Sequence, residues 1–266
     1  MTATESNALA SQAGHWYDRK TGEPRYEVEG KQGRMRPSTL ADARKLDLVP
    51  SVTLILKIAA QPGLEIWKAR QILESSMTLP MLPGEIVDDY AKRVIEDSRE
   101  QGRKAAERGT ELHAAIEKWI LSGGSLHDPA WGDHIIELLR TMSQYGIALY
   151  KGRAEHSFAS PLGYGGKIDF HNDEPLVLDF KTRASIDDSK QLSWPEHIQQ
   201  LAAYGFGLWP SKYAPLFRAL NVFIGIEDKK VRIVEHEWPD ICEAWEQFKL
   251  LLEYWHRIKK FGKYAQ

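Results

Sequence analysis

The spacing of hydrophobic residues changes near residue 147. Before this point apolar side chains recur with a helical period, which predicts helices over 50–56, from 64 onward and over about 86–121. After it, apolar and polar positions alternate, which predicts the strands 147–158, 165–171, 175–181, 219–226 and 231–238. One helix at about 194–208 interrupts these strands, and Pro239 opens a last one. The order predicts an α/β fold: a mixed central β-sheet flanked by helices, with an N-terminal helical extension.

This pattern divides the chain into two parts. We expect residues 1–48 to form an N-terminal arm, with a short hairpin around the turn-forming residues 20–24 and a basic segment at 31–45. We expect 49–266 to form a single domain with three sections, namely a helical part at 49–146, a sheet core at 147–238 and a C-terminal helix at 239–262.

Composition narrows the class of protein. The 266 residues contain 35 Lys+Arg and 37 Asp+Glu, so the net charge of −2 excludes a surface coated with basic residues but not a local basic groove. No apolar run approaches the ~20 residues of a membrane helix, and we expect no membrane partner. Residues 1–14 have the features of neither a secretory signal nor a transit peptide, so we expect a disordered lead-in and a cytoplasmic protein of a bacterial or phage-infected cell. The single cysteine, Cys242, excludes an intrachain disulfide, a Cys-rich zinc site and a four-Cys iron–sulfur cluster.

The strands 165–171 and 175–181 carry the candidate chemistry. A turn at 173–175 would place Asp169 directly opposite Asp179, with Lys167 and Lys181 on the same face. The other face would carry the core residues Ile168, Phe170, Leu178 and Phe180. Two opposed carboxylates repel each other, so either one is protonated or a cation such as Mg²⁺ or Mn²⁺ lies between them. The alternative is a solvent-facing strand pair in which two lysines offset two aspartates.

Three blocks of sequence resemble a known family. Gly166-Lys167-Ile168-Asp169, followed by Asp179-Phe180-Lys181, resembles the core of the PD-(D/E)XK nuclease superfamily. The segment from Arg108 to His113 is similar to the Gly-x-x-x-His helix of the RecB-like branch, and Gln200 to Tyr204 is similar to its Gln-x-x-x-Tyr helix. The blocks occur in the family's order. Pro50-Ser51-Val52-Thr53 also resembles a motif of the phage-type and mitochondrial genome-maintenance-type exonucleases of this branch.

The resemblance implies a restriction-endonuclease-like core and a metal site. The implied ligands of Mg²⁺ or Mn²⁺ are His113, Asp169, Asp179, the backbone carbonyl of Phe180 and, less specifically, Glu155. Lys181 would orient the attacking water and stabilise charge on the phosphate. Gln200 and Tyr204 lie four residues apart on one helix face, where both could support the site. The lone cysteine separates this chain from relatives that carry an iron–sulfur cluster.

The expected partner is DNA, as single strands or duplex ends, together with a single-strand annealing or binding protein. The candidate DNA-binding residues are Ser51, Thr53, Arg108, Arg183 and Trp194, and Trp67 could also stack on bases. Two basic segments, 31–45 and 249–263, could flank a DNA channel. Taken singly, each residue has a simpler explanation as a solvated helix face or as core.

The sequence therefore predicts a divalent-metal-dependent DNA exonuclease that hydrolyses phosphodiester bonds in recombination, repair or phage DNA processing. Two alternatives stay open: a structure-specific endonuclease of the same superfamily, and a non-catalytic DNA-binding module on the same fold. Gly109 adds a structural expectation, because a glycine within the run 86–121 either breaks the helix or permits a close backbone approach.

Overall fold

The computed structural model describes residues 15–30, 33–59, 62–125, 128–209 and 216–264. The expected lead-in 1–14 and Lys31 of the basic segment lie outside these ranges. The first half contains β1 (Trp16–Asp18), β2 (Glu27–Glu29), β3 (Met35–Pro37), α2 (Leu40–Lys45), β4 (Leu48–Pro50), α3 (Val52–Leu56), α4 (Pro62–Thr78), α5 (Val87–Leu121) and α6 (Gly132–Gln144). The second half contains η2 (Leu149–Lys151), β5 (Arg153–Ser160), β6 (Tyr164–Asn172), β7 (Leu176–Arg183), α7 (Pro195–Leu208), β8 (Arg218–Gly225), β9 (Val231–His236), α8 (Trp238–Ile258) and η3 (Gly262–Tyr264).

A five-stranded mixed sheet forms the centre of the molecule, in the order β5-β6-β7-β8-β9. Neighbouring strands are antiparallel except β7 and β8, which are parallel and are connected through α7. In the β6–β7 ladder Phe170 pairs with Leu178, which is the predicted register. The prediction of a mixed α/β sheet flanked by helices is confirmed.

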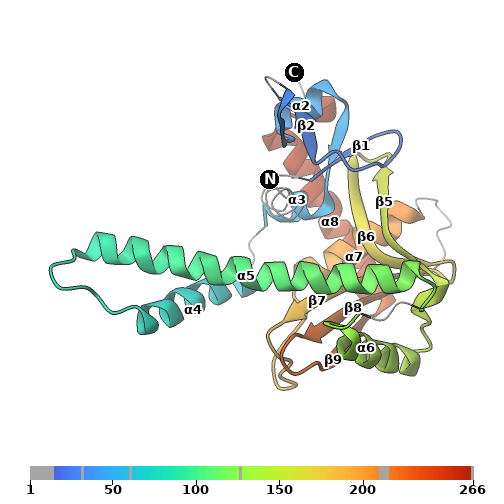
Figure 1. Ribbon diagram of the computed structural model, residues 1–266. Coiled ribbons are helices and arrows are strands. Elements are labelled where there is room, and N and C mark those ends of the chain that lie inside the picture. Colours follow the sequence, from blue (N-terminus) through green and yellow to red (C-terminus); the bar gives the residue numbers. More distant parts are fainter. Residues whose placement is uncertain (1–14, 31–32, 60–61, 126–127, 210–215, 265–266) are drawn as a thin grey trace.

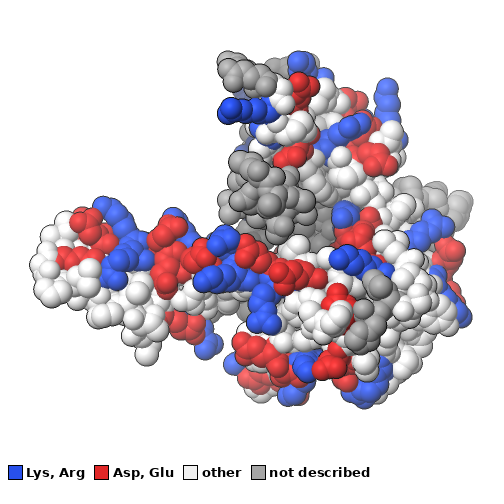
Figure 2. Space-filling view, viewed as in Figure 1, with Lys and Arg blue, Asp and Glu red and all other residues white. Residues whose placement is uncertain are grey.

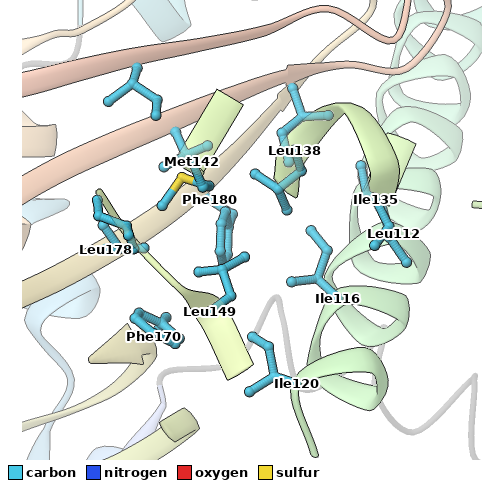
Figure 3. Close-up of a cluster of buried hydrophobic side chains, with 14 of the residues drawn as sticks. Leu112, Ile116, Ile120, Ile135, Leu138, Met142, Leu149, Phe170, Leu178 and Phe180 are labelled. Atoms are coloured by element: carbon cyan, nitrogen blue, oxygen red, sulfur yellow. The ribbon is translucent and has the colours of Figure 1, made fainter. Parts of the chain in front are cut away.

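Helices cover both faces of the sheet (Figure 1). On one face α5 and α6 pack against the apolar residues of β6, β7 and β8, as Figure 3 shows for Leu112, Leu138 and Phe180. On the other face α7 and α8 contribute to two further clusters, one with Val177 and Ala219 and one with Tyr164. The site described below lies where these layers meet along β6 and β7.

At the predicted hairpin around residues 20–24 the chain turns and pairs antiparallel, with a bridge between Tyr17 and Pro24 and backbone hydrogen bonds between Asp18 and Glu23 and between Trp16 and Arg25; β1 also pairs with β4. Two other local predictions were wrong. Residues 147–152 do not form a strand, because Ile147 and Leu149 are buried in the α5–α6 cluster and the chain makes a short 3₁₀ turn before β5. Ile168 packs in the cluster of α3 and α8, whereas Phe170 packs in that of α5 and α6, so the predicted common face of these residues is divided.

The N-terminal elements pack on the body of the molecule. Trp16 is buried and its ring lies 6.1 Å from that of Trp255 on α8. Ser51 bridges to Gly165 of β6, so the chain following β4 contacts the central sheet at β6. The predicted division after residue 48 falls inside β4, which pairs with β1, so it does not coincide with a break between elements.

Helix α5 runs without a break for 35 residues. Gly109 therefore does not end the helix but allows α5 to lie close to β7, because a Cβ atom at this position would be 2.6 Å from Oγ1 of Thr182. The first half of α5 packs against α4, and the two helices project from the body as an arm (Figure 1). Among the described residues no helix is long and apolar enough to cross a membrane.

Candidate active site

Three acidic residues share one row of the central sheet. The pairs Ala154–Phe170 and His156–Ile168 place Glu155 at the level of Asp169, and the register of β6 and β7 places Asp179 at the same level. Neither acid pair is part of a ladder, since the β6–β7 ladder ends at Phe170 and Leu178. Instead, the carboxylate of Asp169 accepts a hydrogen bond of 2.8 Å from the backbone N–H of Phe180. The strands thus separate where the acids lie.

Glu155 has a backbone conformation that matches this separation. Its φ of 54° lies in the left-handed region, which a non-glycine residue adopts within a strand only at a cost of about 1–3 kcal/mol. The neighbouring residues of β5 are paired normally with β6. Such local strain is typical of functional sites, where the surrounding structure fixes a side chain in an otherwise unfavourable position.

His113, Glu155 and Asp169 form a compact group, which we call the acid cluster. Each offers one ligand atom within 4.8 Å of the others, and His113 Nδ1 lies 3.7 Å from Asp169 Oδ2. Lys167 forms an ion pair with Glu155. Burial raises the pKa of Asp169 to about 6; His113 opposes this shift, while the charges of Asp179 and Glu155 add to it. Carboxylate oxygens with one imidazole nitrogen suit Mg²⁺ or Mn²⁺.

Glu117 extends the negative charge of this region. It lies one helical turn after His113 on α5, and burial together with the charge of Glu155 raises its pKa. The carboxylates of Glu117, Glu155 and Asp169 therefore lie near the imidazole of His113 in a partly buried volume. Lys167 is a nearby cation, and it forms an ion pair with Glu155.

Asp179 belongs to an adjacent hydrogen-bonded group. Its Oδ1 accepts from Lys181 Nζ at 2.8 Å and from Gln200 Nε2 at 2.9 Å, and its Oδ2 accepts from Asn221 Nδ2 at 2.9 Å. Gln200 also contacts the hydroxyl of Tyr204 at 3.0 Å and accepts from Lys181. We call this group, Asp179, Lys181, Gln200, Tyr204, Asn221 and His236, the Asp179 network.

Two members of the Asp179 network were missed by the sequence analysis. Asn221 is fully buried, and its Oδ1 accepts from Nε2 of His236 at 2.8 Å. Because an ionised Asp179 can only accept, it fixes the orientation of the Asn221 amide, which in turn requires the proton of His236 to lie on Nε2. The available indication was that Asn221 is the one polar residue in the otherwise apolar predicted strand 219–226.

A groove of about 820 Å³ opens beside the Asp179 network. It is reached by Lys181 and Gln200, and four of the five predicted DNA-binding residues line it: Thr53, Arg108, Arg183 and Trp194. Trp67 of α4 lines it too. The fifth, Ser51, is buried and its hydroxyl accepts from the backbone N–H of Leu54 as the cap of α3.

The groove carries cations that lack ion-pair partners among the described residues: Lys57, Arg108 and Arg183. Arg108 lies over the ring of Trp131 and Arg183 over that of Phe223, at 5.9 and 5.3 Å from the ring centres. Burial lowers the pKa of Arg183. The carboxylates that line the groove are those of Glu196 and Glu227. Held by aromatic contacts, both guanidinium groups keep donors for an anionic ligand.

The two basic segments lie elsewhere. None of their described residues lines the groove, and several are paired locally, such as Arg36 with Asp42 and Arg257 with Glu253. Arg44 donates to the backbone carbonyls of Lys259 and Lys260, so the two segments contact each other. The described parts of these segments therefore do not form the groove, and the expectation that they flank a DNA channel stays a prediction.

Comparison with known proteins gives little beyond this geometry. No protein-family model and no curated protein matches the chain. Among solved structures, the crystal structure of SSO0001 is similar over 71% of this chain and 85% of its own, at 15% identity and a TM-score of 0.31. A similarity at this level carries no argument about function.

Proposed function

We propose that this protein is a divalent-metal-dependent deoxyribonuclease of the PD-(D/E)XK type, on a restriction-endonuclease-like core, and that it acts as an exonuclease on DNA ends or single strands. One observation carries the proposal. The acid cluster and the Asp179 network lie at the same level of the sheet. Lys181, which is bound to Asp179, also lines a groove that carries two tryptophans and cations without ion-pair partners among the described residues.

The residues present fit a bound Mg²⁺ or Mn²⁺. His113, Glu155 and Asp169 would hold it, and Asp179, whose charge acts on Asp169, and the carbonyl of Phe180 that the resemblance implies would complete the ligand set. When bound, such an ion lowers the pKa of a coordinated water and neutralises charge on a phosphate. Asp179 Oδ1 already accepts two hydrogen bonds, one from Lys181, so it gains capacity for a cation when Lys181 turns into the groove.

The remaining residues would bind and orient the DNA. The ammonium of Lys181 can donate to a phosphate oxygen or to the attacking water, and Arg108 and Arg183 can bind neighbouring phosphates. The rings of Trp67 and Trp194 offer flat surfaces on which unpaired bases stack, at about 1–3 kcal/mol per base. Stacking of this kind favours single strands or frayed ends over an intact duplex.

The acid cluster favours an enzyme over a non-catalytic binding module. An ionised carboxylate in a buried site costs stability, and the pKa of Asp169 is raised chiefly by its burial and further by the charges of Asp179 and Glu155. A module that only bound DNA phosphates would gain nothing from the two carboxylates of the acid cluster.

The test is hydrolysis of DNA labelled at the 5′ or the 3′ end, single- and double-stranded, by the purified protein with Mg²⁺ or Mn²⁺. We expect wild type to shorten labelled strands and to leave covalently closed circular DNA intact, and we expect Lys181→Ala to abolish the reaction. Lys190→Ala is the matched control, since Lys190 is an exposed lysine outside the groove. Cleavage of circular DNA would support the endonuclease alternative. Absence of cleavage with either metal, or full activity of Lys181→Ala, would contradict the proposal.

A further inference from the structure

His197 on α7 continues a row of side chains that the Asp179 network begins. His197, Gln200 and Tyr204 follow one another at intervals of three and four residues, so they lie on one face of the helix. On that face Gln200 contacts both Asp179 and Lys181. His197 is buried and, like Lys181 and Gln200, lines the groove. The row therefore continues from the network into the groove at His197.

The ring of Phe223 holds His197 beside the two cations of β7. Phe223 is fully buried and pairs with Lys181 in the parallel ladder of β7 and β8. The centre of its ring lies 5.8 Å from that of the His197 ring and 5.3 Å from the guanidinium carbon of Arg183. Side chains alternate along a strand, so Lys181 and Arg183 point to the same face of the sheet. Nitrogen donors of Lys181, Arg183 and His197 therefore meet at one wall of the groove.

A hydrogen bond fixes which ring nitrogen of His197 carries the proton. Nδ1 accepts from the backbone N–H of Trp194 at 3.2 Å, where α7 begins. Because a backbone N–H can only donate, Nδ1 is unprotonated and the proton of the neutral ring lies on Nε2. Burial lowers the pKa of His197 to about 3, and the charge of Lys181 adds to this shift. The side chain is therefore a neutral N–H donor near pH 7.

This N–H is left for a ligand. Nε2 has no hydrogen-bond partner among the described residues, although His197 is only 8% exposed. It is not one of the described unpaired atoms that are closed off from solvent, so it opens to the groove that the residue lines. Buried polar groups are rarely left without a partner, and this position therefore favours a ligand that accepts a hydrogen bond.

We propose that Nε2 of His197 donates a hydrogen bond to a phosphate oxygen of DNA bound in the groove, between the charged groups of Lys181 and Arg183. This inference rests on the proposed function, because it takes DNA as the ligand. A phosphate fits because its oxygens accept several hydrogen bonds at once and both cations attract its charge. A third cation at this place would repel Lys181 and Arg183, whereas a neutral imidazole adds a donor without adding charge.

The distribution of charge makes such a donor important. On the face shown in Figure 2, the Lys and Arg side chains of the described residues are interspersed with Asp and Glu over the arm and the body. A surface of mixed charge binds the DNA backbone weakly, because counterion release requires cations that face the phosphates. Affinity for DNA therefore depends on donors held in fixed positions, as at this wall of the groove.

Two amide side chains separate the two roles of the imidazole. Counted from Cβ, the side-chain oxygen of asparagine takes the place of Nδ1, whereas the NH₂ of glutamine takes the place of Nε2. His197→Asn should therefore keep the acceptor for the N–H of Trp194 and a melting temperature close to that of wild type, but lose the donor. His197→Gln should keep the donor. If the residue served only to cap α7, the order of the two variants would be reversed.

The test is the affinity for a fluorescein-labelled single-stranded oligothymidylate, measured by fluorescence anisotropy with a chelator present so that the strand is not cut. We expect His197→Asn to weaken binding at least about tenfold and His197→Gln to recover most of this loss. Thr39→Ala is the matched control, since Thr39 caps α2 outside the groove. Wild-type affinity of His197→Asn, equally weak binding by His197→Gln, or no binding by wild type would overturn the proposal. Binding by wild type without hydrolysis in Mg²⁺ or Mn²⁺ would contradict the nuclease activity alone.

The salt dependence of the same affinities tests the neutral charge of His197. A neutral donor releases no counterion, so His197→Asn should leave the slope of log affinity against log salt concentration unchanged. Arg183→Gln should reduce the slope by about 0.7, because it removes a cation that faces a phosphate of a single strand. A comparable reduction by His197→Asn would show a charged imidazole and overturn the assignment of a neutral donor.

Discussion

The two halves of the candidate site differ in how well their polar groups are satisfied. In the Asp179 network both carboxylate oxygens of Asp179 accept hydrogen bonds from neutral or cationic donors. In the acid cluster three potential ligands face one another, and the pKa of Asp169 is raised by its burial. The comparison teaches that one half keeps a carboxylate and a lysine in fixed positions, whereas the other stores electrostatic repulsion that a cation would relieve.

The largest expected effect is on activity. Asp169→Asn and Asp179→Asn should each lower the rate of DNA hydrolysis at least ~10³-fold, about 4 kcal/mol in the activation free energy, because each removes a charge from the implied metal site. The control is Asp173→Asn, since Asp173 lies in the turn of the same hairpin and its side chain is 93% exposed. Rates should be measured at several metal concentrations. Equal rates in all three variants would contradict the assignment of the site.

Asp179→Asn and Asp169→Asn should have opposite effects on the free energy of unfolding, which would distinguish the Asp179 network from the acid cluster. Asp179→Asn turns an acceptor into an amide whose NH₂ faces the donors of Lys181, Gln200 and Asn221, so we expect a loss of about 3–5 kcal/mol in the free energy of unfolding. Asp169→Asn removes a buried charge from the acid cluster and should stabilise the metal-free protein above pH 6. Urea unfolding with a chelator present measures both. Destabilisation by both variants to the same extent would remove the distinction.

The pH dependence of the metal-free protein follows from Asp169. The folded state holds the proton of Asp169 up to about pH 6, whereas the unfolded chain releases it near 3.8, so the folded state binds more protons between these values. The stability contributed by this group therefore falls as the pH rises from about 4 to about 6, by up to about 3 kcal/mol. The difference between wild type and Asp169→Asn in urea unfolding at each pH isolates this contribution. A difference that does not vary over this range would show that Asp169 titrates normally.

The smallest expected effect is on stability, and it concerns the distance between α5, which carries His113, and β7, which carries Asp179 and Lys181. Gly109 lies one turn before His113 and contacts Thr182, the residue after Lys181, so this contact sets how closely α5 approaches β7. Gly109→Ala alone should destabilise the protein by about 1 kcal/mol, since the new methyl group meets Thr182. In a Thr182→Ala background the same change should become stabilising by about 0.5–1 kcal/mol, because alanine favours the helix. A double-mutant cycle measured by urea unfolding tests this contact. If it shows no coupling energy between residues 109 and 182, the proposed role of the contact is contradicted.

Much of the sheet could be predicted because its signals are local. The hairpin of β6 and β7 has a short turn, so its register followed from the turn predicted at 173–175. The alternating pattern similarly located β8 and β9 to within a few residues. The prediction of a strand at 147–152 failed because Ile147 and Leu149 pack in a tertiary cluster, which the local hydrophobic pattern does not reveal.

Most residues of the candidate site could be predicted from the sequence, but its division into the acid cluster and the Asp179 network could not. The resemblance supplied His113, Asp169, Asp179, Lys181, Gln200 and Tyr204, and the structure brings them to one region. It could not supply Asn221 or His236, because their contact with Asp179 depends on the parallel pairing of β7 with β8 across the intervening helix. The left-handed conformation of Glu155 could not be predicted either, because it lies between two regular pairs of the β5–β6 ladder and glutamate has no preference for a positive φ.

The uninterrupted course of α5 limits how the arm can vary in length. The same helix carries the arm at its start and His113 near its end, so each residue inserted between them would turn the tip by about 100° and move it by about 1.5 Å. Insertions of about seven residues in both α4 and α5 would return the exposed apolar side chains of α4 to their original direction. Related chains should therefore differ in arm length by steps of about two helical turns, with the end of α5 that carries His113 unchanged.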